Sequence, residues 1–345
     1  MISKKYITEH KNKEIYLYHF KNESGSEMKV TNYGAIITSI KMPDRDGFFD
    51  EVSLGYEDVS SYIKDNPFYF GCIIGRYANR IKNGRFTLNN INYQLTTNEG
   101  KNQLHGGHIG FHQRTWEGRV EEDVLILSYL SPDGEELYPG TVQIEVKYQL
   151  TNENEIIISY EGVSDKDTII NLTNHSYFNL NGSKSAIFDH ELFIDADYFT
   201  PTDEELIPTG ELRHVEGTAF DFRESRKIGE RIFDFEDEAI SIGNGYDHNY
   251  VLNGSGLRKV AEVNEQTTGR CMEVFTNQPG MQFFTAHIIH PNTIGSNNNI
   301  YEPYYGICLE PQVHPDSPNK DHFPNCVLRR GETYHNETIY KFSAK

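Results

Sequence analysis

Apolar and polar residues alternate along several short segments of this chain. The longest regular run covers residues 142–150, where every second residue is Val, Ile, Tyr or Leu. A two-residue period is typical of a strand that buries one of its faces. The same period, or two such runs joined by a turn, marks residues 28–40, 86–95, 156–160, 192–198 and 334–342. The pattern predicts a chain built mainly from strands.

Helical periodicity is scarce by comparison. Only residues 59–64 and about 225–233 predict helices, and both segments are short. Turns rich in Gly, Asn and Pro separate the strands, which favours an antiparallel sandwich or barrel. No internal repeat, low-complexity segment or Pro/Ser linker interrupts the chain, so we expect residues 1–345 to form one domain.

One segment, residues 171–180, combines a strand pattern with groups capable of chemistry. It reads Asn-Leu-Thr-Asn-His-Ser-Tyr-Phe-Asn-Leu. As an extended strand, it would place Asn171, His175 and Tyr177 on one face and Leu172 and Phe178 on the other. A face of amides, one imidazole and one aromatic ring suits a polyhydroxylated ligand. The alternative interpretation is a half-buried strand whose polar face is merely solvated.

Charge and composition exclude several classes of partner. The chain has 51 acidic and 32 basic residues, a net charge of −19, and no run of Lys or Arg. This argues against nucleic acid and against anionic membrane surfaces as partners. The first ten residues lack an apolar signal segment and no long apolar run follows, so we expect a cytoplasmic protein. The four cysteines form no Cys-x-x-Cys pair and are expected to be reduced.

Two segments in the first third of the chain carry candidate binding groups. Arg80, directly after Asn79, is able to donate two hydrogen bonds to sugar hydroxyls or to hold a carboxylate, although a surface hairpin with solvated arginines is the alternative. His105 precedes two glycines, which allow the backbone to approach a ligand closely. A metal site built from His105, His108 and His112 is disfavoured because the segment is rich in glycine and lacks matching carboxylate or thiolate ligands.

Two segments in the last third carry candidate acids and bases. Asp247 follows a glycine-led turn and precedes a strand pattern, although an Asp in a turn most often only caps it. Glu310 shares one strand face with Gln312, while Ile307 and Leu309 share the other. A buried carboxylate can have a pKa near neutrality, and together with His175 it would allow proton transfer at neutral pH. Nucleophile-elbow, phosphate-loop and dinucleotide motifs are absent.

Several motifs occur in a fixed order from about residue 30 to the end of the chain. They are Gly75-Arg76, Asn79-Arg80-Ile81, Leu104-His105-Gly106-Gly107, the segment 171–180, Asp247-His248, Gln278-Pro279-Gly280 and Leu309-Glu310-Pro311-Gln312. In this order they resemble the aldose 1-epimerase (galactose mutarotase) family. The resemblance implies an all-β fold, a large antiparallel β-sandwich with a sugar cleft on one sheet and few short helices.

The same resemblance implies a role for individual residues. Glu310 would be the general base that takes the proton from the C1 hydroxyl, and His175 the general acid that protonates the ring oxygen. His105 would stabilise charge near that oxygen. The residues implied to bind the sugar hydroxyls or line the cleft are Arg80, Asn79, Asp247, Gln278 and Tyr177. The reaction would require neither a metal nor another cofactor.

Two other functions remain as alternatives. A hexose-6-phosphate 1-epimerase on the same scaffold would need a cationic pocket for the dianion, and the motifs bring no extra Arg or Lys cluster. A non-catalytic sugar-binding protein could lose Glu310 or His175, and this chain has both. We therefore expect a small aldose as the partner, with the protein a monomer or a weak homodimer.

Overall fold

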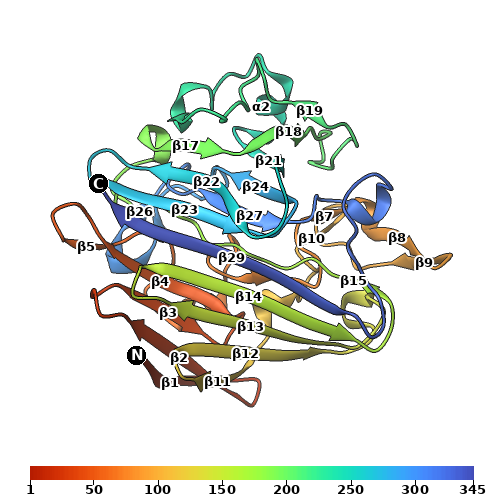
Figure 1. Ribbon diagram of the computed structural model, residues 1–345. Coiled ribbons are helices and arrows are strands. Elements are labelled where there is room, and N and C mark those ends of the chain that lie inside the picture. The colour runs from red at the N-terminus through yellow and green to blue at the C-terminus, as the bar shows by residue number, and fades with distance from the viewer.

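The computed structural model describes residues 1–345 as layers of antiparallel sheets. The largest sheet has nine strands and faces the viewer in Figure 1. In spatial order its strands are β11 (Glu117–Glu121), β12 (Val124–Ser131), β13 (Val142–Leu150), β14 (Glu155–Ser164), β29 (Thr333–Ala344), β23 (Arg270–Thr276), β22 (Arg258–Asn264), β17 (Glu191–Ile194) and β20 (Arg226–Lys227). The middle of the chain and its C-terminal end meet where β14 pairs with β29.

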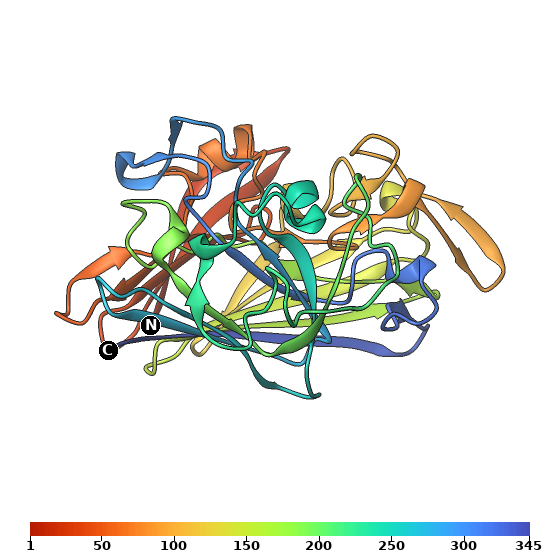
Figure 2. The ribbon, with the colours of Figure 1, turned by 90° about the horizontal axis from the view of Figure 1, so that it is seen from above.

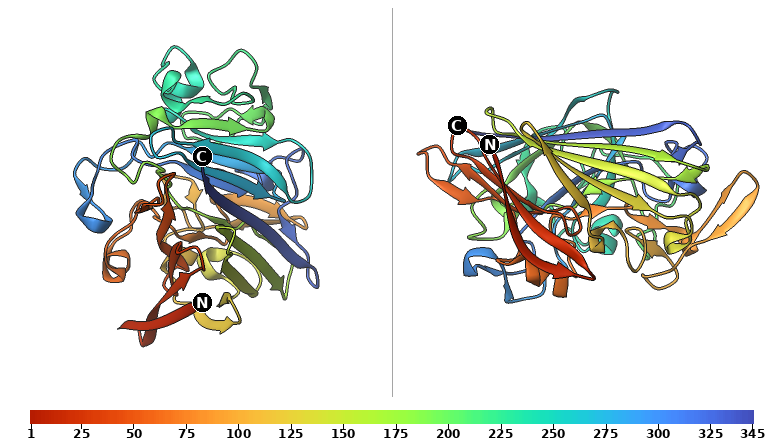
Figure 3. Two further views of the ribbon diagram at one scale, coloured as in Figure 1. Left: turned by 60° about the vertical axis from the view of Figure 1, so that its left-hand side comes forward. Right: turned by 90° about the horizontal axis from the view of Figure 1, so that it is seen from below.

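Two five-stranded sheets lie on the other side of the core. One is N-terminal and contains β1 (Ile2–His10), β2 (Lys13–Lys21), β3 (Glu27–Thr31), β4 (Ile36–Pro43) and β5 (Phe49–Glu51). The other contains, in spatial order, β19 (Arg213–His214), β18 (Ala196–Thr200), β21 (Asp247–Leu252), β24 (Gly280–Phe284) and β27 (Cys308–Gln312). Figure 3 shows the red N-terminal strands crossing the long strands of the nine-stranded sheet.

Five short two-stranded sheets and two helices complete the fold. The pairs are β6 (Ile73–Ile74) with β16 (Thr173–Asn174), β7 (Arg80–Ile81) with β10 (Gln103–Leu104), β8 (Arg85–Leu88) with β9 (Ile91–Gln94), β15 (Thr168–Ile169) with β28 (Val327–Leu328), and β25 (Thr293–Ile294) with β26 (Ile300–Tyr301). The hairpin β8–β9 projects at one end of the molecule in Figure 2. The helices are α1 (Val59–Lys64) and α2 (Glu238–Gly243).

Neither helix is long and apolar enough to cross a lipid bilayer.

The core explains why the strands alternate. One buried apolar cluster of 54 residues draws side chains from all three large sheets, among them Ile37 on β4, Ile144 on β13 and Leu309 on β27. Hydrogen bonds also join the layers. The Tyr340 hydroxyl on β29 donates to the Leu309 carbonyl on β27 over 2.8 Å. The all-β sandwich expected from the sequence is confirmed, with few short helices.

The expected single strand over residues 171–180 is wrong. Only Thr173–Asn174 is a strand, and the rest of the segment is irregular and buried throughout. Leu172, Phe178 and Leu180 do enter the core as the alternation predicts. The opposite side is not solvated, because other segments cover it and accept its hydrogen bonds. An alternating pattern therefore identified the buried residues but not the backbone conformation.

Two other expectations also need correction. Residues 192–198 do not form one strand, because the chain passes at Asp195 from β17 in the nine-stranded sheet to β18 in a five-stranded sheet. Residues 225–233 form the short strand β20 and a 3-10 turn instead of a helix. The second helix lies later, where Asp237 caps it by accepting a hydrogen bond from the Ala239 amide.

Candidate active site

A polar face on the sheet β18–β21–β24–β27 carries two of the candidate residues, Asp247 and Glu310. Asn249, Gln282 and Glu310 are directly opposite one another on adjacent strands β21, β24 and β27. Residues next to them along the strands, such as Phe283 and Leu309, point to the other face and belong to the core. Because side chains alternate along a strand, burying the apolar set in the core fixes the direction of the polar set.

The carboxyl group of Glu310 is buried. Its exposure is 2%, its Oε2 has no hydrogen-bond partner, and its Oε1 lies 3.8 Å from Nε2 of His175. Burial raises the pKa of the Glu310 carboxyl well above its usual range; the charge of Asp247 reinforces this effect and that of Arg80 opposes it. A buried carboxylate without a partner is costly, which is typical of a group that meets a ligand.

His175 is held from both sides of its irregular segment. Its amide donates to the Cys72 carbonyl over 2.9 Å, and its carbonyl accepts from the Gly71 amide over 3.0 Å. The ring stacks on Tyr177 with the centroids 5.1 Å apart, and Nδ1 lies 3.6 Å from Sγ of Cys308. Burial lowers the pKa of His175 to about 4, although the charge of Asp247 acts in the opposite direction. These hydrogen bonds and ring contacts hold Nε2 of His175 on the side of Glu310.

His105 lies beside His175, with the ring centroids 5.3 Å apart. The Asn79 amide donates to Nδ1 of His105 over 3.1 Å, so the neutral ring carries its proton on Nε2. Burial, reinforced by His175 and Arg80, lowers the pKa of His105 well below its usual range. The next residue must be glycine, because a Cβ at Gly106, whose φ is +84°, would lie 2.0 Å from the Gly75 carbonyl oxygen. His105 is therefore a neutral hydrogen-bond donor.

Arg80 and Asp247 provide the charges of the site. Nε and Nη2 of Arg80 each donate to a Glu99 oxygen over 2.7 Å, an arrangement that fixes the guanidinium plane. Oδ1 of Asp247 accepts from Nε2 of Gln282 over 2.6 Å. The charge of Asp247 also acts on Arg80 and on Glu310. Arg80, Asp247 and Glu310 thus belong to one electrostatic cluster.

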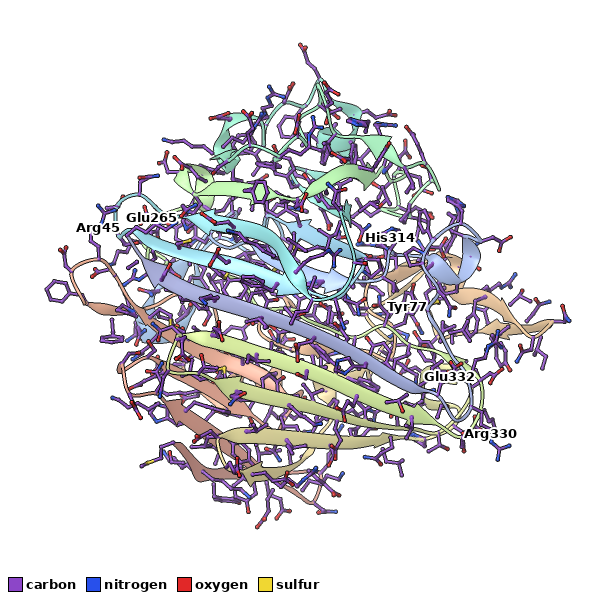
Figure 4. All side chains as sticks on the ribbon, viewed as in Figure 1. Arg45, Tyr77, Glu265, His314, Arg330 and Glu332 are labelled. Carbon is purple, nitrogen blue, oxygen red and sulfur yellow. The ribbon has the colours of Figure 1, made fainter.

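Hydrogen bonds beyond β27 bring Arg80 close to this strand. The Tyr77 hydroxyl donates to the His314 carbonyl over 3.3 Å, and both residues are labelled in Figure 4. The Asp316 amide donates to the Arg80 carbonyl over 2.8 Å, and Oδ1 of Asp316 accepts from the Lys82 amide. Residues 77–82 are therefore tied to the segment that directly follows Glu310.

The structure brings together Glu310, His175, His105, Asn79, Arg80 and Asp247, but two predicted residues stand apart. Gln278 lies before β24 and lines a separate cavity of about 290 Å³ with Ile170, Val313 and Tyr334. Tyr177 is fully buried beneath His175, and its hydroxyl donates to the Phe68 carbonyl. Tyr177 supports the imidazole and is not part of an open surface.

Gln282 is a candidate site residue that sequence reasoning missed. It lies between Asp247 and Glu310 on the polar face, whereas Gln278 was chosen from the Gln-Pro-Gly motif. The two glutamines are four residues apart, and the pairing of β24 with β27 places Gln282 opposite Glu310. The alternation over residues 280–284, with Met281 and Phe283 in the core, was the available signal.

The candidate metal ligands also separate. His108 is exposed, while His105 and His112 are buried and each pack edge-on against the Tyr69 ring, with ring centroids 4.9 and 4.8 Å from it. A different group, formed by His175, Cys308 and Glu310, has its potential ligand atoms within 4.8 Å of one another. The two residues suited to proton transfer are thus adjacent to a buried thiol.

Comparison with known proteins places the chain in a family. Residues 16–341 match the family model described as aldose 1-epimerase. The galactose mutarotase of Homo sapiens is 42% identical over 316 residues, which cover 91% of this chain and 90% of that protein. The aldose 1-epimerase of Escherichia coli K12 is 36% identical over 334 residues and 95% of each chain.

Solved structures give the same result. The galactose 1-epimerase of Lactobacillus acidophilus NCFM is 30% identical and superimposes with a TM-score of 0.88, over 100% of this chain and 99% of that chain. A GalM/aldose epimerase homologue from C. elegans, 29% identical, has a TM-score of 0.88 over 94% of this chain and 98% of that chain.

Proposed function

This chain belongs to the aldose 1-epimerase family, and we propose that Glu310 and His175 are the base and the acid with which it acts. It is an isomerase that interconverts the α and β anomers of free hexoses such as galactose and glucose. The family sets the reaction, and the site suggests how this chain performs it.

Ring opening requires one proton to be removed and one to be added. Glu310 takes the proton of the C1 hydroxyl while His175 donates a proton to the ring oxygen, and the bond between C1 and the ring oxygen breaks to give the open-chain aldehyde. Rotation about the C1–C2 bond presents the other face of the aldehyde. Reclosure reverses both transfers: His175 takes the proton of the hydroxyl at the former ring oxygen, and Glu310 returns one to the carbonyl oxygen. Each positioned proton-transfer group typically contributes ~10²–10⁴-fold to the rate.

The buried pair of Glu310 and His175 holds one proton throughout this cycle. Burial raises the pKa of Glu310 and lowers the pKa of His175, so in the empty site the proton resides on the carboxyl. That neutral arrangement is the one needed to close the open-chain sugar. The ion-paired arrangement, with the proton on His175, is the one needed to open the ring. The two placements of one proton thus correspond to the two halves of the reaction.

The remaining polar groups would orient the sugar. His105 offers its Nε2–H next to His175, where charge develops on the ring oxygen. Asp247, Gln282 and Arg80 offer an acceptor, an amide and a guanidinium on the same side of Glu310. Gln282 replaces Gln278 in this proposal because Gln278 lines a separate cavity. Asn79 would add its side-chain amide, whose oxygen already accepts from the Arg80 amide.

The observation that carries this proposal is the isolated Glu310 carboxylate facing Nε2 of His175 over 3.8 Å. A sugar 6-phosphate suits the site less well, because Arg80 is already paired with Glu99 and the acidic Asp247 lies beside it. A free aldose needs no cofactor for this chemistry. We further propose that the protein acts in the cytoplasm, as a monomer or weak homodimer, with residues 1–345 in one domain.

Polarimetry tests the proposed substrates directly. Freshly dissolved α-D-galactose and α-D-glucose should approach their equilibrium rotation faster with the protein than in buffer, and the ratio of the two rates ranks the sugars. Equal decay with and without protein for both sugars would contradict the proposal and direct the assay to sugar 6-phosphates.

A further inference from the structure

A buried thiol lies beside the acid–base pair and takes no part in the mechanism above. Cys308 is two residues before Glu310 on β27, so both side chains project from the same face. Its Sγ lies 3.6 Å from Nδ1 of His175, and the potential ligand atoms of His175, Cys308 and Glu310 all lie within 4.8 Å of one another. One imidazole, one thiol and one carboxylate thus lie next to one another, the thiol at Nδ1 and the carboxylate at Nε2 of the ring.

We propose that His175, Cys308 and Glu310 bind a thiophilic divalent cation such as Zn²⁺ or Cd²⁺, and that the bound ion inhibits the enzyme. Zn²⁺ bonds measure about 2.3 Å to sulfur and about 2.0–2.2 Å to nitrogen or oxygen, which separates tetrahedral ligand atoms by roughly 3.3–3.7 Å. The 3.6 Å between Sγ of Cys308 and Nδ1 of His175 already has this value. Oε1 of Glu310 faces Nε2 of the same ring, so Glu310 completes the set by rotating its carboxyl group toward Nδ1, within the 4.8 Å that separates the three groups.

The ligand set selects the kind of ion. A thiolate with one imidazole favours Zn²⁺ and Cd²⁺ over Mg²⁺ and Ca²⁺, which prefer oxygen ligands. Binding releases two protons to solvent, one from the Cys308 thiol and one from the Glu310 carboxyl, and the resulting thiolate and carboxylate together neutralise the two positive charges of the ion. Asp247, whose negative charge reaches Glu310 and Cys308, further favours a cation at this point. Three protein ligands leave the fourth position for water.

Occupation of this site would be incompatible with catalysis. The ion engages both His175 and Glu310, which must exchange protons with the sugar, and it lies where the sugar is bound. Inhibition should therefore compete with galactose. This part of the inference rests on the proposed function, whereas binding of the ion itself does not.

Titration with Cd²⁺ tests the site without reference to activity. Wild-type protein should show the ultraviolet charge-transfer band of a cadmium thiolate, saturating at about one ion per chain, and saturating galactose should abolish it. Cys308→Ser should lose the band. Cys271→Ser, which changes another buried cysteine on β23, should retain it. Mg²⁺ and Ca²⁺ at the same concentration should not displace the cadmium.

Mutarotation rates, each compared with the rate of the same variant without metal, test the inhibition. Zn²⁺ should inhibit the wild type, EDTA should restore the rate, and the inhibition constant should rise at least ~10-fold in Cys308→Ser. A cadmium band that persists in Cys308→Ser and withstands galactose, or no band with excess Cd²⁺, would overturn the metal site. A band lost in Cys308→Ser without inhibition of the wild type would uphold the site and overturn the acid–base roles.

Discussion

Glu310 and His175 face each other across 3.8 Å, but two different kinds of backbone bring them there. Glu310 lies on β27, a regular strand paired with β24 over five residues. His175 lies on the segment 171–180, of which only Thr173–Asn174 is a strand. Along β27 alternation alone separates the core-facing Leu309 from Glu310. Along the irregular segment, individual hydrogen bonds and ring contacts set each direction.

The irregular segment depends on its own amide side chains. Nδ2 of Asn171 donates to the Ala78 carbonyl and its Oδ1 accepts from the Val313 amide, each over 3.1 Å. Nδ2 of Asn174 donates to the Gly71 carbonyl over 2.9 Å. These contacts replace the ladder of a strand, and they connect the segment to the regions that carry Arg80 and Glu310. The acid should therefore be more sensitive than the base to changes in its supporting residues.

The largest expected effect comes from removing the base itself. Glu310→Gln keeps the size of the side chain but cannot accept the C1 proton, so the mutarotation rate should fall by about 10²–10⁴-fold while galactose still binds. Polarimetry and calorimetric titration with galactose measure the two properties. Glu51→Gln is a matched control, since Glu51 is also buried but lies in the N-terminal sheet, and it should retain the rate. A wild-type rate in Glu310→Gln would contradict the mechanism.

Removing the acid should have a slightly smaller effect of the same kind. His175→Asn leaves a hydrogen-bonding side chain but no group that can protonate the ring oxygen, and we expect a loss approaching that of Glu310→Gln. His190→Asn is the control, because His190 is equally buried and accepts from the Leu180 amide away from the site. If the two histidine variants lose the same activity, the loss reports folding and not acid catalysis.

A change in the support of His175 should reduce both stability and rate. Asn171→Ala leaves the Val313 amide and the Ala78 carbonyl without their partner, at a cost of ~1–3 kcal/mol in the free energy of unfolding. The resulting shift of His175 should slow mutarotation by about 10- to 100-fold, because catalysis depends on placement within about 1 Å. Denaturant unfolding and polarimetry check the two values. An unchanged rate in a destabilised variant would show that the segment holds His175 without Asn171.

The corresponding change beneath Glu310 should affect stability alone. Tyr340→Phe removes the hydrogen bond to the Leu309 carbonyl and should cost about 1 kcal/mol of unfolding free energy. The pairing of β27 with β24 remains, so the mutarotation rate should stay within about twofold of wild type. The same two measurements apply. A rate loss as large as that of Asn171→Ala would remove the distinction between the two regions.

The same contrast explains what the sequence could predict. Regular alternation predicted β13, β14, the hairpin β8–β9 and the face on which Glu310 lies, because the core imposes the pattern. It failed for residues 171–180, where Asn side chains bond to the backbone of other segments, and for residues 192–198, where the chain changes sheets.

The site shows the same limit. His175 and His105 were identified by residue type and motif, but their 5.3 Å separation depends on contacts between distant segments. Gln282 was missed in favour of Gln278 because the register between β24 and β27 is a tertiary property. The bidentate contact of Arg80 with Glu99 was also invisible, since neither residue belongs to a longer regular element that would bring them together.

The pH dependence of kcat/KM for galactose tests most directly whether the buried pair shares one proton. The lowered pKa of His175, about 4, means that a second proton joins the pair only near that pH, and the raised pKa of Glu310 means that the last proton leaves only well above the ordinary carboxyl range. As the pH is lowered, the rate should therefore fall only when the pH approaches about 4. If kcat/KM instead fell with a midpoint near pH 6.5 as the pH was lowered, as for a histidine of ordinary pKa, the result would contradict the account.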